Sequence, residues 1–137
     1  MVRYTLGLLT TSLVLAATPL ACANDHIFAE EQKKRCSAGG QQDMNLCMAD
    51  EYRKVDAELN ENFKRLTSVL ANPTGIRNAQ RAWIRFRDAE CSNEVIQLGG
   101  SLQPFAYYSC MIEFTLERTR HIKWHLAQDC NGCPLRK

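Results

Sequence analysis

The apolar residues of the chain recur every three or four positions over three long stretches, which is the spacing of helices with one apolar face. The stretches predict helices over 43–70, 74–98 and 104–128, and a shorter leading helix is expected over 25–35. No segment alternates between apolar and polar residues at period two. We therefore expect an all-α fold, a small bundle of three main helices.

Residues with strong preferences for helix ends mark the boundaries. Asp43 is a plausible N-cap of the first helix, and Pro73 follows its end. Gly99 and Gly100 can supply the left-handed backbone with which helices often end, and Pro104 suits the first turn of the third helix. The expected apolar stripes are Met44, Cys47, Met48, Tyr52, Val55, Leu59, Phe63, Leu66 and Leu70, then Ile76, Ala79, Trp83, Phe86, Cys91 and Leu98, then Tyr107, Met111, Phe114, Ile122 and Leu126.

Length and charge narrow the class of protein. The 137 residues are 45% hydrophobic and 23% charged, which fits one domain and neither a disordered chain nor a multispanning membrane protein. A net charge of +2 lacks the cationic excess of a basic nucleic-acid module. After the third helix, residues 129–137 are expected to form a loop.

The N-terminus has the features of a secretory signal peptide. Arg3 precedes an uncharged apolar run over 6–17, which is shorter than a comfortable membrane span of about 20 residues. Ala21 and Ala23 suit a signal peptidase, so we expect residues 1–23 to be removed before Asn24. The single domain would then be residues 24–137, and its location periplasmic or secreted.

A lipid anchor at Cys22 is the alternative at this terminus. Pro19 and Leu20 make a poor approach to a lipidated cysteine, so soluble export is favoured.

Cysteines are abundant for so short a chain, and six remain after cleavage at the expected site. An even number fits disulfides in an oxidising compartment. Proximity along the chain favours Cys36 with Cys47 and Cys91 with Cys110, each bond adding about 3 kcal/mol of stability. Six cysteines nevertheless permit 15 connectivities.

The C-terminal region offers two interpretations of one set of residues. His121 and His125 share a helix face, and Cys130 with Cys133 follows, so the four could form a tetrahedral metal site. Exported thiols tend to oxidise, and a tight turn at 131–132 favours a local disulfide. We expect a third disulfide, Cys130–Cys133, and no cofactor.

A motif in the second helix resembles a known family. Residues 80–91 read QRAWIRFRDAEC; Cys36 and Cys47 precede DAELN at 56–60, and Cys110 precedes TLER at 115–118. This order resembles the LprI-type lysozyme-inhibitor domain over about residues 36–120. The resemblance implies a small exported helical domain, facing the cell envelope, that binds and blocks lysozyme.

The motif residues favour a structural role inside the bundle. Asp56 and Asn60 flank the core side of the first helix, and Gln80, Trp83 and Arg87 share one face of the second. Because buried charges must be paired, we expect a polar network that fixes the helix register. Its members are Asp56, Asn60, Gln80, Trp83, Arg87, Glu90, Thr115 and Arg118.

A binding or catalytic role for the same face is the alternative. Glu90 and Glu94 could imitate the carboxylate pair of a glycosidase, but two carboxylates one helical turn apart more often form a salt-bridged surface. We therefore expect no enzyme activity.

An inhibitor needs only a surface that covers the cleft of lysozyme. Residues 43–62 carry six acidic and two basic side chains, and Asp50 and Glu61 on the outward face are candidate contacts with a cationic enzyme. An ordinary solvated helix face is the alternative, and so is insertion of the turn over 99–103 into the cleft. Two further functions stay open: an envelope adaptor or immunity-like protein for another hydrolase or toxin, and a metal-binding module.

Overall fold

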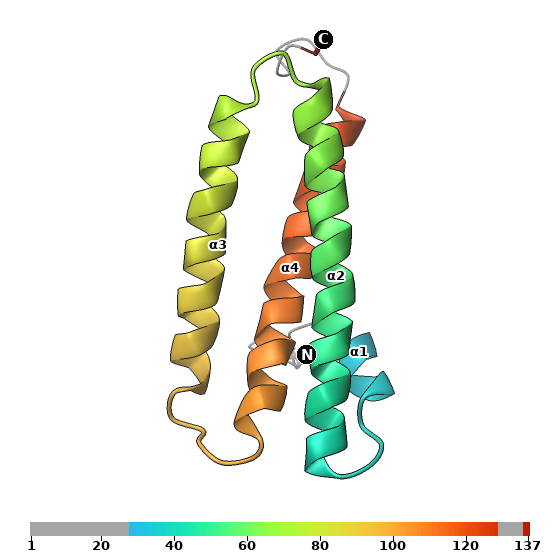
Figure 1. Ribbon diagram of the computed structural model, residues 1–137, viewed down its shortest axis with the longest axis vertical. Helices are drawn as coiled ribbons and strands as arrows, with labels where there is room; N and C mark the ends of the chain where they lie inside the picture. The colour runs from blue at the N-terminus through green and yellow to red at the C-terminus, as the bar shows by residue number, and fades with distance from the viewer. Residues whose placement is uncertain (1–27, 129–135) are drawn as a thin grey trace, which may run out of the picture.

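The protein is an all-α bundle, as its apolar periodicity predicts. The computed structural model describes residues 28–128 and 136–137, which contain α1 (Glu30–Arg35), α2 (Gln41–Val69), α3 (Thr74–Val95) and α4 (Gln103–Ala127). Figure 1 shows α2 and α4 running in the same direction side by side, with α3 antiparallel to both and α1 at the lower end. Among these residues there is no strand, only one isolated bridge between Leu70 and Arg136.

The start of α2 differs from the expected one. Asp43 is not the N-cap, because the helix begins at Gln41 and Gly40 precedes it with an extended backbone. The Asp43 carboxylate accepts a hydrogen bond of 3.1 Å from the Gly40 amide, so it still satisfies a free N–H group at the positive end of the helix.

The connection between α3 and α4 is built on two glycines. Gly99 and Gly100 have φ angles of 57° and 64°, in the left-handed region that disfavours side chains. The helix itself ends earlier than predicted, at Val95, where the next amide bonds to the Asn93 carbonyl in a tighter turn. Pro104 lies in the first turn of α4, as expected.

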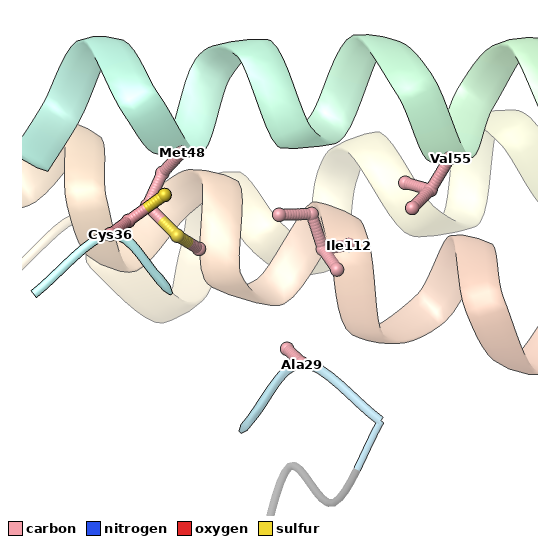
Figure 2. Packing of buried hydrophobic residues seen from close by; sticks show 5 residues of the cluster. All are labelled: Ala29, Cys36, Met48, Val55 and Ile112. Atoms are coloured by element: carbon pink, nitrogen blue, oxygen red, sulfur yellow. The ribbon is translucent and has the colours of Figure 1, made fainter. Parts of the chain in front are cut away.

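The apolar core lies mainly between α2 and α4. Met48 and Leu59 of α2 and Ile112 and Ile122 of α4 are each at most 1% exposed. Figure 2 shows Met48 above and Ile112 below, with Ala29 approaching from the segment before α1. Burial of these side chains is the main source of stability in the bundle.

The short helix α1 is fixed by polar contacts at both ends. The amides of Phe28 and Ala29 donate to the Glu113 carboxylate of α4 at 3.1 and 2.7 Å. At the other end, Arg35 donates to Glu51 of α2 at 2.5 Å. The predicted helix over 25–35 therefore begins at Glu30 in the structure, and residues 25–27 lie outside the described residues.

The α3 helix buries only part of the apolar stripe expected for it. Phe86 and Leu98 are 52% and 51% exposed, whereas Gln80 and Arg87 are 5% exposed. The buried positions of this helix are Gln80, Arg87, Cys91 and Val95. Its inward face is therefore partly polar: Cys91 of the expected stripe is buried and Trp83 is half-buried, but Phe86 faces solvent.

Two disulfides hold the ends of the helices together. Cys36 is bonded to Cys47 and Cys91 to Cys110, the two pairs favoured by proximity. Cys22, Cys130 and Cys133 lie outside the described residues, and so does the expected signal peptide over 1–23. Within the described ranges, none of the helices has the length and apolar character needed to cross a membrane.

Candidate functional site

Arg87 is the centre of the polar network on the inward face of α3. Its Nη1 lies 3.2 Å from the Asp56 carboxylate of α2 and donates to the Thr115 hydroxyl of α4 at 3.1 Å. Its Nε and Nη2 contact the neighbouring Asp88 at 3.0 and 2.9 Å. A single guanidinium thus joins all three long helices, and its charge is paired as burial requires.

Aromatic rings enclose this guanidinium. It lies 5.0 Å from the ring centre of Trp83 and 5.6 Å from that of Tyr52, both within the range of cation–π attraction. Burial lowers the pKa of Arg87, but nearby Tyr52, Asp88 and Asp56 more than offset this and raise it above its usual value. For Tyr52 burial acts in the opposite direction, because it disfavours the charged phenolate, and the pKa of Tyr52 is raised to about 12. Both groups therefore keep their ordinary charge states at neutral pH.

The other expected network residues divide into two groups. Asn60 is exposed but donates to the Asp56 carboxylate at 2.9 Å, so it supports the partner of Arg87. Glu90 is exposed on α3, while the carboxylates at Arg87 belong to Asp56 and Asp88. The role of Asp88 was missed, although its place next to Arg87 in the sequence was a usable signal.

Arg118 forms a second, weaker link between α3 and α4. Its Nε donates to the Gln80 side chain at 2.9 Å, and its guanidinium lies 5.7 Å from the Trp83 ring centre. Burial lowers the pKa of this guanidinium. Gln80 and Arg118 were both expected in the network, and their pairing was not specified by the sequence.

Intramolecular contacts occupy much of the acidic stretch of α2. Glu51, only 8% exposed, accepts from Lys54 at 2.6 Å and from Arg35, and Glu58 pairs with Lys123 of α4 at 2.5 Å. Asp50 forms an ion pair with Arg53 on the exposed side. Glu61 is also exposed. The surface charge that remains for an external partner is therefore smaller than the sequence count indicates.

The rings of the two candidate histidine ligands lie next to each other, tilted by 39°. The ring centres of His121 and His125 are 4.7 Å apart, and Trp124 lies beside both. Burial, with His121 and Arg118 nearby, lowers the pKa of His125. Within the described ranges no group of three or more His, Cys, Asp or Glu residues could hold a metal ion. The proposed partners Cys130 and Cys133 lie outside those ranges.

An open groove of about 550 Å³ separates α3 from α4 on this side of the bundle. It is lined by Trp83, Phe86, Phe114, Glu117, Arg118, Arg120, His121 and Trp124. Apolar periodicity did not indicate this groove, because the expected stripe placed Phe86 in the core.

Comparisons with known proteins place the chain in a family. Residues 32–122 match the family described as lysozyme inhibitor LprI. The uncharacterized protein R02472 of Rhizobium meliloti (strain 1021) is 32% identical over 125 residues, covering 79% of this chain and 90% of its own. The uncharacterized protein YecT of Escherichia coli (strain K12) is 30% identical over 154 residues, covering 96% and 94%.

No solved structure matches the chain significantly. The family match covers more than half of the sequence, including both described disulfides and the network around Arg87. The chain therefore belongs to the LprI lysozyme-inhibitor family.

Proposed function

We propose that this protein is exported, loses residues 1–23, and binds a peptidoglycan-cleaving lysozyme so that its substrate cannot enter the cleft. The role requires no catalysis and no cofactor. The observation that carries the proposal is the match of residues 32–122 to the lysozyme inhibitor family. The two disulfides add support for an oxidising location, where such bonds form and persist.

The architecture suits a rigid binding protein. The Cys91–Cys110 disulfide and the Arg87 network hold the three long helices in register, and Cys36–Cys47 fastens the end of α1 to α2. Little conformational entropy would therefore be lost when a partner binds. Asp50 and Glu61 remain the candidate contacts, because both are exposed on α2. A carboxylate there would meet the positive surface of a cationic lysozyme.

The test is lysis of a peptidoglycan suspension by several lysozyme types, followed by turbidity, with the oxidised protein from Asn24 added in increasing amounts. We expect saturable inhibition of at least one type at near-equimolar ratio. The double variant Asp50→Asn/Glu61→Gln should weaken inhibition, and the matched control Glu30→Gln/Glu31→Gln, also exposed but on α1, should not.

Folded protein that inhibits no lysozyme type would contradict the proposal. A pull-down of another hydrolase or toxin by the same protein would then favour the adaptor or immunity-like role. Bound zinc with two reactive thiols would favour the metal-binding module.

A further inference from the structure

The groove between α3 and α4 exposes aromatic rings beside the half-buried cation of Arg118. Phe86 of α3 and Trp124 of α4 are 52% and 54% exposed, and Trp83, also in the groove lining, is half-buried. Phe86 meets Phe114 edge to face, with ring centres 5.6 Å apart. Rings held on rigid helices but left in water are a typical lining of a binding site for a small molecule.

The Arg118 guanidinium is incompletely satisfied in this groove. Its Nη2 is buried and has no hydrogen-bond partner within the described part of the chain. Its contacts are the neutral Gln80 amide, the Trp83 ring and the His121 Nδ1, which lies 3.3 Å from Nη1. A buried donor without an acceptor costs free energy, which a ligand oxygen that displaces the atoms covering Nη2 would recover.

Arg87 has carboxylate partners, and Arg118 has none among the contacts described above. Both guanidinium groups lie between α3 and α4 against the Trp83 ring. Arg87 contacts two carboxylates, Asp56 and Asp88. Burial lowers the pKa of Arg118, whereas neighbouring groups raise that of Arg87 above its usual value. The environment of Arg118 is thus complementary to one further negative charge.

The charged residues that line the groove indicate what net charge a ligand should carry. Glu117 and Arg120 are both exposed there, with opposite charges, and Arg120 also lies 5.3 Å from the Phe28 ring centre. The remaining fixed charge is that of Arg118, which calls for a single anionic group. A carboxylate matches the planar guanidinium and carries one charge at neutral pH.

We propose that this groove binds a small organic acid that carries both a carboxylate and a flat ring. The carboxylate contacts the Arg118 guanidinium, and the ring packs among Trp83, Phe86 and Trp124. The exposed side chain of His121 must rotate away from Nη1 to admit the carboxylate. A volume of about 550 Å³ lies within the range typical of small-molecule sites. This site is independent of lysozyme inhibition.

The chain offers a direct readout, because both of its tryptophans line the groove. We would titrate the oxidised protein with phenylacetate, which has both ring and charge, and follow tryptophan fluorescence. Phenylacetamide has the ring without the charge, and acetate has the charge without the ring. For a ligand of this size we expect a dissociation constant of about 1 mM for phenylacetate. Phenylacetamide and acetate should each bind at least about tenfold more weakly than phenylacetate.

Two variants test the geometry. Arg118→Gln should remove the preference for phenylacetate over phenylacetamide, and the matched control Arg77→Gln, exposed on α3 outside the groove, should keep it. Because Arg118→Gln could unfold the bundle, Trp124→Ala provides a second test, as its side chain is more than half exposed. Calorimetry should show at least a fivefold loss of phenylacetate affinity in that variant.

The results separate the proposal from simpler explanations. Equal binding of phenylacetate and phenylacetamide would overturn it, since Arg118 would then contribute nothing. Absence of saturable binding by wild-type protein, or full binding by folded Trp124→Ala, would overturn it as well. Loss of lysozyme inhibition has no bearing on any of these measurements.

Discussion

The two sides of the bundle are held together by different forces. The α2–α4 side is closed by apolar side chains such as Leu59 and Ile112, which are at most 1% exposed. The α3 side is joined to the other helices by the Cys91–Cys110 disulfide and by the guanidinium groups of Arg87 and Arg118. Apolar burial is non-directional, whereas a disulfide and paired charges fix position.

This difference separates stability from register. The α2–α4 pair supplies most of the buried apolar surface, so its loss should unfold the protein. The contacts of α3 set where its exposed rings stand, since Phe86 is placed by the same helix that carries Arg87. Substitutions on the two sides should therefore differ in kind as well as in size.

The largest loss of stability is expected from a substitution in the apolar core between α2 and α4. Ile112→Ala leaves a cavity at a position that is 0% exposed, and should lower the free energy of unfolding by about 4 kcal/mol. Urea denaturation followed by circular dichroism measures this. The matched control Ile84→Ala, on the exposed side of α3, should change stability by no more than ~0.5 kcal/mol. Equal losses in both variants would show that α3 is packed as tightly as α4.

Removing the disulfide of α3 should give the next largest effect. Cys91→Ala/Cys110→Ala opens a loop with a sequence separation of 19 and should cost about 3 kcal/mol. Amide hydrogen exchange should accelerate throughout α3 before it does so in α2 and α4. The control Cys36→Ala/Cys47→Ala should instead accelerate exchange in α1. Uniform acceleration over all helices would contradict a separable α3.

Breaking the Arg87 network should cost somewhat less. Arg87→Ala leaves Asp56 without its cation, and because that carboxylate is one-third exposed, we expect a loss of about 2 kcal/mol. The melting temperature of the variant, and of Trp83→Ala, should fall clearly. A variant that melts like wild type but no longer binds its partner would show that these residues form a contact site.

The smallest effect should appear on acidification. Hydrogen bonds from Lys54 and Arg35 hold the pKa of Glu51 below its usual value of 4.5. The folded state therefore binds the proton less readily than the unfolded state. The stability contributed by Glu51 is present above about pH 4.5 and is lost as the pH falls through the lower folded pKa. Its size should be about 1 kcal/mol at most, as Lys54 and Arg35 are exposed.

Denaturant titrations at pH 6 and at progressively lower pH values measure this loss. Glu51→Gln should flatten the dependence below about pH 4.5. The control Glu61→Gln, at an exposed position of the same helix, should leave the wild-type slope unchanged. If Glu51→Gln kept the same pH dependence of unfolding free energy as the wild type, the stabilising role assigned to the Glu51 contacts would be wrong.

The sequence predicted the elements better than their contacts. Periodicity and end signals located the three long helices to within a few residues, because these signals are local. They did not show that α2 packs mainly on α4, nor that Phe86 faces solvent, because an apolar stripe does not indicate which helix it packs against. The network residues were named from the motif, but Asp88, not Glu90, contacts Arg87.

The order of the two described disulfides bears on how the chain acquires them. Each bond joins cysteines that follow one another among the described residues, with sequence separations of 11 and 19, and neither loop encloses the other. A chain that meets an oxidant progressively from its N-terminal side would have Cys36 and Cys47 together before Cys91 appears. Pairing in order of appearance then yields the native bonds directly, with no shuffling between them.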